Sequence, residues 1–135
     1  MSQTKAQLVS QVSDAQNNTT GGSNAGDSFT GTDANDNTLF GYDSGTAITT
    51  GDRNTALGDS SLVATTTGSD NTAIGREALK TNTTGNRNTA IGKNVLNANT
   101  TANNNTAVGY ESLLSNTTGT RNVAVGAYAL DANTT

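Results

Sequence analysis

Apolar residues return at a fixed interval through residues 37–135. A motif Asn-Thr-X-apolar-Gly begins every 17 residues, with no insertion between copies, at Asn37, Asn54, Asn71, Asn88, Asn105 and Asn122. The fourth place of the unit is always apolar: Phe40, Leu57, Ile74, Ile91, Val108 and Val125. The ninth place is Leu62, Leu79, Leu96, Leu113 and Leu130, with Gly45 in the first copy. A period of this length is typical of repeat proteins in which each unit stacks on the next.

Each unit is long enough for two short strands of about five residues and two turns, but too short for a pair of helices. The first predicted strand is the Asn-Thr-Ala-apolar segment, in which alternation puts Thr and the branched residue on one face and Ala on the other. The fifth-place glycine ends it at a sharp corner. The second predicted strand runs around the ninth-place Leu to a Thr-Thr pair. We therefore expect an all-β fold, a parallel β-solenoid or β-roll of six 17-residue coils.

Stacked coils place identical side chains above one another at about 4.8 Å. We expect Ile74 above Ile91, Leu79 above Leu96, and each motif asparagine on the next, because stacked amides can satisfy one another's hydrogen bonds. The predicted structural ladders are the asparagines that begin the six motifs, Ile74, Ile91, Val108 and Val125 in the fourth place, and the five ninth-place leucines.

A strip of small residues occupies the third place: Ala56, Ala73, Ala90, Ala107 and Ala124. Such a strip would let a second copy of the chain approach closely. We therefore expect a homo-oligomer, and specifically a homotrimer with the alanine strips facing inward.

The first third of the chain lacks the repeat. Thr4 and Gln7 fit a capping box, and residues 5–16 then predict a short helix with Leu8, Val9 and Val12 on one stripe. A helix this short needs a partner to be stable. We interpret residues 1–16 as an attachment helix and residues 17–36, which are polar and rich in glycine, as a linker or irregular lead-in segment.

Composition argues against catalysis. The chain has no cysteine and no histidine, which removes thiolate metal sites, the usual general base and the commonest metal ligand. The aspartates lack the spacing of a calcium loop. Glu77 and Glu111 lie two coils apart, roughly 10 Å along the stack, with no cleft between them. We expect no enzyme, no cofactor and no metal.

Other polar features have structural interpretations. Asn-X-Thr sequons at Asn82, Asn99, Asn116 and Asn133 recur because the repeat does. Asp59 and Arg76 share the sixth place of adjacent coils, so we expect a solvated surface pair.

The charge is unevenly distributed but modest. The formal net charge is −4, made up of −6 in residues 1–70 and +2 in residues 71–135, and neither half has the basic footprint of a nucleic-acid binder. No stretch is apolar enough to span a membrane, and the N-terminus does not resemble a signal peptide. We expect neither nucleic acid nor membrane as a partner.

The repeat resembles those of two protein groups. The run Asn-Thr-Ala-Ile-Gly at 71–75 and 88–92, with Asn-Thr-Thr-Gly at 82–85 and 116–119, is similar to the head repeat of trimeric autotransporter adhesins and to repeats in bacteriophage fibres, particularly those of marine cyanophages. The match covers residues 37–135. Resemblance to the adhesin heads implies a trimeric, left-handed parallel β-roll. Residues 4–9 also look like the start of cyanophage structural proteins.

The resemblance favours a phage protein, because an autotransporter needs a signal peptide, a stalk and a membrane barrel. We expect a virion fibre or spike, made in the host cytoplasm, anchored to other virion proteins through residues 1–16 and projecting for host or surface attachment. Another protein or another copy is expected at the C-terminal end. The alternatives are a surface-recognition solenoid whose Thr-Thr rows bind a glycan or ice, and a fragment of a bacterial adhesin head.

Overall fold

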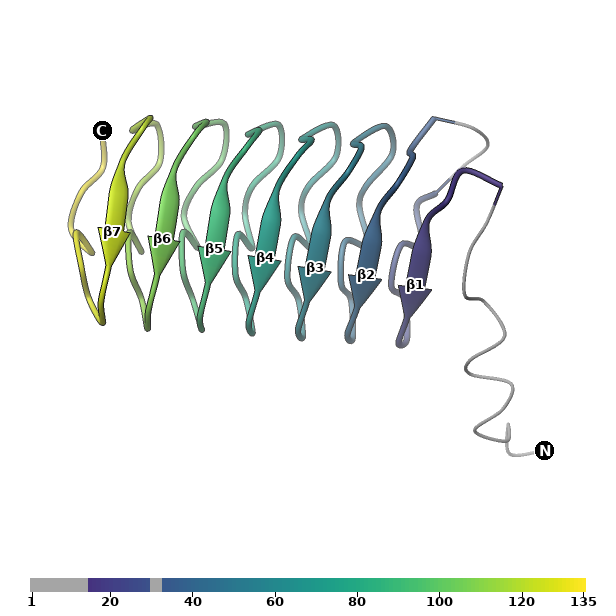
Figure 1. Cartoon of the computed structure of the whole chain (residues 1–135), viewed down its shortest axis with the longest axis horizontal. Coiled ribbons are helices and arrows are strands. Elements are labelled where there is room, and N and C mark those ends of the chain that lie inside the picture. The colour runs from purple at the N-terminus through teal and green to yellow at the C-terminus, as the bar shows by residue number, and fades with distance from the viewer. Residues whose placement is uncertain (1–14, 30–32) are drawn as a thin grey trace.

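The computed structural model describes residues 15–29 and 33–135, and they form one parallel β-solenoid (Figure 1). Seven three-residue strands form a single parallel sheet in chain order, each pairing with the next. They are β1 Thr19–Gly21, β2 Thr38–Phe40, β3 Thr55–Leu57, β4 Thr72–Ile74, β5 Thr89–Ile91, β6 Thr106–Val108 and β7 Val123–Val125. Strands β2 to β7 begin the six predicted coils, and the register places Ile74 opposite Ile91. The predicted parallel solenoid is confirmed, whereas the predicted attachment helix and its Leu8, Val9 and Val12 lie in residues 1–16, of which only 15 and 16 are described.

The interpretation of residues 17–36 as a linker is wrong where β1 forms. Thr19 pairs with Thr38, and the Asn18 side chain accepts hydrogen bonds from the backbone N–H and the side-chain amide of Asn37. This first coil is spaced by 19 residues and has glycine in the place of the apolar residue, which hides it from a search for the 17-residue motif. The N-terminal part of the solenoid is therefore one coil longer than predicted.

Each described coil has one strand, not the two predicted. The ninth-place leucines have φ angles of 50–52° in Leu62, Leu79, Leu96, Leu113 and Leu130, in the left-handed region. A left-handed residue turns the backbone and cannot belong to an extended strand. The back of the coil is therefore a series of turns, yet it is still tied to its neighbours by backbone bonds such as Thr66 N–H to Thr83 O, at 2.9 Å.

The two faces of the strand are reversed relative to the packing we predicted. The third-place alanines are the buried residues, Ala56, Ala73, Ala90, Ala107 and Ala124 being at most 3% exposed, so they offer no strip to a second copy. The fourth-place residues point outward, with Leu57 52% and Val125 70% exposed. The physical reason is space. The fully buried leucines reach the interior from the back of the coil, and only a small residue fits opposite them in so narrow a core.

In the first 17-residue copy the large and the small core residue have exchanged places. It has Leu39 in the third place and Gly45 in the ninth, the reverse of the small and large residues elsewhere. Leu39 is fully buried, and a Cβ built on Gly45 would lie 2.7 Å from its side chain. Leu39 therefore occupies the space that the ninth-place leucine fills in later coils.

The fifth-place glycines are required at the corner that follows each strand. Gly58 has φ of 140°, and a Cβ there would lie 2.7 Å from the carbonyl oxygen of Gly75 in the next coil. In Figure 1 the strands run downward on the near side while successive coils step from right to left, so the solenoid is left-handed, as the resemblance implies.

Enlarging a core alanine should test which face is inside. We expect Ala90→Leu to lower the free energy of unfolding by about 1–3 kcal/mol through overpacking, measured by urea denaturation. The matched control is Ala127→Leu, at an exposed position, for which we expect a change of less than about 0.5 kcal/mol. Equal effects of the two substitutions would contradict an inward-facing Ala90.

Candidate functional site

The motif asparagines form a hydrogen-bonded ladder inside the solenoid. The Nδ2 of Asn71 donates to Oδ1 of Asn54 at 3.1 Å and to the carbonyl of Gly85 at 2.8 Å. The Oδ1 of Asn71 accepts from the backbone N–H and from Nδ2 of Asn88. Both hydrogens and both lone pairs of the amide are thus used, which is what full burial requires. The same pattern holds for Asn37, Asn54 and Asn88. The ladder is incomplete at its C-terminal end, where Asn105 Oδ1 accepts only the backbone N–H of Asn122 and the buried Nδ2 of Asn122 has no hydrogen-bond partner.

The sequon asparagines form a second ladder. Asn99 donates to Oδ1 of Asn82 at 2.9 Å and to the carbonyl of Ala102 at 3.2 Å. Asn116 and Asn133 continue the series. Asn82, Asn99 and Asn116 are fully buried. Their role is internal, because a buried amide is closed to a sugar-transferring enzyme.

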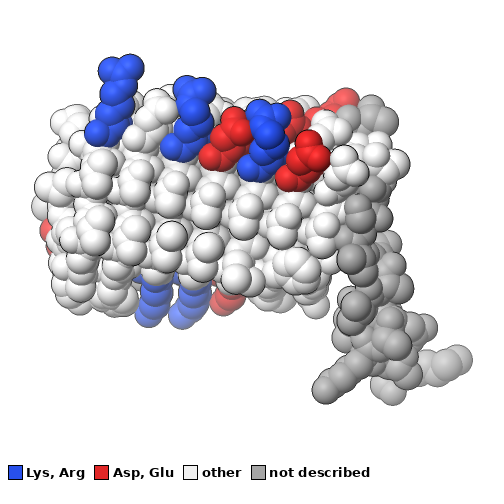
Figure 2. All heavy atoms as spheres, in the orientation of Figure 1, with Lys and Arg blue, Asp and Glu red and all other residues white. Residues whose placement is uncertain are grey.

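The outward side of the sheet is an uncharged face. We call its fourth-place series the apolar row: Phe40, Leu57, Ile74, Ile91, Val108 and Val125. The row lies beside the outward threonines that begin strands β2 to β6. Figure 2 shows this face as an uncharged band between two lines of charged side chains. The apolar row therefore has charged residues along one edge and, at its middle coils, along the other.

The Thr-Thr pairs are not two equivalent rows. The first threonine of a pair bonds the next coil, as in Thr66 Oγ1 to Thr83 O at 3.2 Å and Thr83 Oγ1 to Thr100 O at 3.1 Å. The second threonines are exposed and their hydroxyls make no hydrogen bond within the described residues: Thr50, Thr67, Thr84, Thr101 and Thr118. In four pairs the first hydroxyl is bonded and the second is available to a ligand, whereas the Thr100 hydroxyl makes no hydrogen bond within the described residues.

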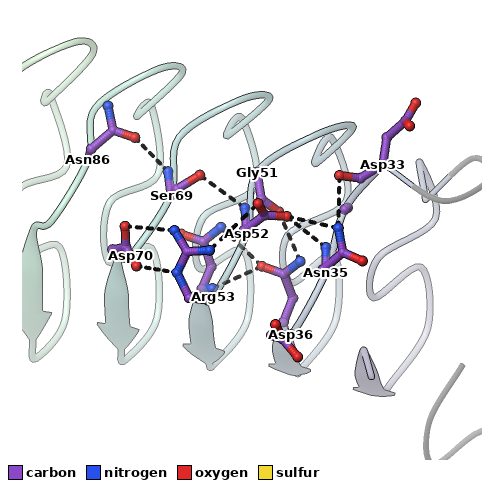
Figure 3. Close-up of polar contacts among 12 residues, drawn as sticks. Asp33, Asn35, Asp36, Gly51, Asp52, Arg53, Ser69, Asp70 and Asn86 are labelled. Carbon is purple, nitrogen blue, oxygen red and sulfur yellow. Dashed lines mark hydrogen bonds and ion pairs between the residues drawn. The ribbon is translucent and has the colours of Figure 1, made fainter. Parts of the chain in front are cut away.

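A third, surface ladder runs along the edge just before the strands (Figure 3). The backbone N–H of Asn35 donates to Asp52 Oδ1 at 2.8 Å, that of Asp52 to Ser69 Oγ at 3.0 Å, and that of Ser69 to Asn86 Oδ1 at 2.8 Å. The series continues from Asn86 to Asn103 at 2.7 Å. Any short side chain with an acceptor oxygen can accept this backbone hydrogen bond. The residue type at this place therefore varies among Asp, Ser and Asn while the hydrogen bond is present in each coil from Asp52 to Asn103.

An ion pair lies on the same edge. The Nε of Arg53 is 2.7 Å from Asp70 Oδ1, and its Nη2 is 3.2 Å from Oδ2. The hydrogen bond from this guanidinium holds the pKa of Asp70 below its usual value, and the same bond raises the pKa of Arg53. Both groups are solvated, so the pair contributes to local order more than to stability.

The opposite edge carries the predicted sixth-place contacts. Arg76 Nε lies 3.4 Å from Asp59 Oδ2, as expected of a surface pair. Further along, Lys93 Nζ is 5.7 Å from the ring centre of Tyr110, which meets the ring of Tyr128 edge to face at 5.3 Å. Within residues 15–29 and 33–135, no group of three acidic, histidine or cysteine side chains is placed to hold a metal ion, and no helix is long and apolar enough to cross a membrane.

Removing one rung of the first ladder should be costly. Asn71→Ala leaves the backbone N–H of Asn88 unpaired and removes one hydrogen bond each from the Asn88 amide, the Asn54 amide oxygen and the Gly85 carbonyl, so we expect a loss of at least about 2 kcal/mol in the free energy of unfolding. The control is Asn97→Ala, which removes one bond at a place that also holds lysine or leucine; we expect a loss below about 1 kcal/mol. Similar losses in urea titrations of the two variants would argue against the ladder's importance.

Comparisons of the chain with protein-family models, with curated proteins and with solved structures found no match in any of the three. The resemblance to fibre and adhesin repeats therefore rests on the repeat motif alone.

Proposed function

We propose that the chain is a structural fibre or spike protein of a virion, a homotrimeric rod that projects for host or surface attachment. The observation that carries the proposal is the uncharged sheet face with its apolar row. Scattered exposed apolar residues are ordinary, but a contiguous row bordered by charge is typical of an interaction surface. A rod built to associate along its length is what a fibre requires.

Because the alanines are buried, we place the contact between copies on the apolar row. Phe40, Leu57 and Ile91 are 42%, 52% and 38% exposed, and all three point away from the core. Covering such side chains against like residues removes apolar surface from water at about 25 cal/mol per Å². This contact needs no rearrangement of the coil.

The partner that fits this face best is another copy of the same chain. Side chains of the apolar row repeat once per coil, at about 4.8 Å, and only a partner with the same period can match them along several coils. A second copy has that period by construction. The number three comes from the resemblance to adhesin heads and phage fibres, in which such repeats assemble around a common axis.

Attachment to the particle is assigned to residues 1–16, with Leu8, Val9 and Val12 as the contact stripe. The C-terminal end is assigned to another protein or copy, and the coil of β7 exposes Val123, Tyr128 and Leu130 at 70%, 55% and 50%.

The assembly predicts a molecular mass near three times the 13.6 kDa of the chain in analytical ultracentrifugation at micromolar concentration. A double substitution Ile74→Lys and Ile91→Lys should produce monomers, because two charges per copy would be desolvated in the interface. The control is Thr67→Lys with Thr84→Lys, which adds the same charge on another face and should leave the mass unchanged. A monomeric wild-type chain, or a trimer that survives the isoleucine substitutions, would refute this interface.

The virion role predicts that peptides of the chain are found by mass spectrometry in purified particles from its source. Their abundance should follow that of other particle proteins through a density gradient. Absence from the particles, with the chain present in the surrounding lysate, would refute the role and leave the oligomer untouched.

A further inference from the structure

The edge of the solenoid that precedes the strands changes in charge from one end of the rod to the other. The residue before each motif asparagine is exposed at this edge, and the series runs Asp36, Arg53, Asp70, Arg87, Asn104 and Arg121. In the first half, Arg53 is neutralised by its two-point contact with Asp70. The arginine of this half is therefore already paired, and the other charge, Asp36, is acidic.

The second half of the edge is different. Arg87 Nε donates to the neutral Oδ1 of Asn104 at 2.9 Å and acts on Asp70 only at longer range. Arg121 is exposed and forms no ion pair with any residue that the structure describes. Two guanidinium groups thus keep free donors on the same line, two coils apart.

Neutral polar groups accompany these arginines. Thr84, Thr101 and Thr118 run parallel to them with free hydroxyls, and Asn86 lies between the two series, its Nδ2 bonded to the carbonyl of Thr84 at 2.9 Å. Residues 83–87, 100–104 and 117–121 contain two arginines and no carboxylate. We call Thr84, Arg87, Thr101, Thr118 and Arg121 the basic stripe.

We propose that the basic stripe binds an extended acidic polysaccharide that lies along the rod. Arginine forms two parallel hydrogen bonds with a carboxylate or a sulfate, and hydroxyl and amide groups suit the sugar hydroxyls between them. Arg87 and Arg121 are separated by about 9.6 Å, two strand spacings, which is the scale of one disaccharide repeat in an extended chain. The proposal names a ligand for the attachment role and rests on that role.

The chemistry of the stripe favours sugar over nucleic acid. Proteins that hold single strands stack bases on aromatic side chains, and the basic stripe has none. The exposed Tyr42, Tyr110 and Tyr128 belong to the sixth and seventh places of their coils, on the opposite edge of the sheet. The stripe shares no residue with the apolar row, so the proposed contact between copies does not use it.

Binding is tested with the whole chain by calorimetry against polyuronate, dextran sulfate and neutral dextran. We expect binding to an acidic polymer and none to neutral dextran, with affinity falling as salt is raised. Arg87→Gln with Arg121→Gln should weaken binding at least about tenfold, since each removes a charge-assisted contact. The control, Arg76→Gln on the opposite edge, should change it less than about twofold.

Each outcome has a distinct meaning. Binding to either acidic polymer that is lost only in the double variant supports the stripe, and comparison of polyuronate with dextran sulfate identifies the preferred acid. Equal losses in Arg76→Gln, equal binding of a single-stranded oligonucleotide of the same length, or no binding to either acidic polymer would overturn it. The molecular mass of the same samples reports on the fibre assembly separately, so a failed ligand and a failed rod are told apart.

Discussion

The structure depends on satisfying the buried asparagine amides. Asn54, Asn71 and Asn88 each give both hydrogens to acceptors and receive two bonds, and their partners lie 17 residues back, 14 residues on and 17 residues on. A residue that cannot pair at this place would leave donors and acceptors unpaired where water does not reach, and each unpaired group costs about 1–3 kcal/mol. The first coil has 19 residues and still keeps both bonds from Asn37 to Asn18, so the ladder fixes the place of the asparagine in each coil and not the length of the coil.

The ladder and its register followed from the sequence, because identical residues at a constant spacing have one way to stack. The direction of the strand faces did not follow. Alternation shows which residues share a face but not which face is inside. Hydrophobicity favours the branched residues for the core, whereas the available volume decides: leucine enters from the back of the coil and leaves room only for alanine. The exchange of Leu39 with Gly45 was the available signal, since it makes sense only if the two places share one space.

The turn conformation at the back of the coil could not be predicted from the residues. Leucine rarely adopts a left-handed backbone, so a ninth-place Leu looks like part of a strand, and its φ near 50° is imposed by the closure of the coil. The candidate surfaces were predicted in part. The contact between Asp59 and Arg76 follows from their common sixth place in adjacent coils. Which threonine of a pair is bonded does not follow from the sequence, because it depends on which hydroxyl reaches a carbonyl of the next coil. The early coil at Asn18 was missed because its strand ends in glycine.

The exchange of Leu39 with Gly45 has a consequence for how such a rod evolves. Both residues belong to the same coil, so the compensation is contained within one unit and crosses no boundary between units. Duplication or loss of a whole unit in the gene would carry both partners together and leave every neighbouring core intact. Rod length can therefore change in steps of one coil without a matching change elsewhere, and the reach of the molecule becomes a trait that selection adjusts in equal increments.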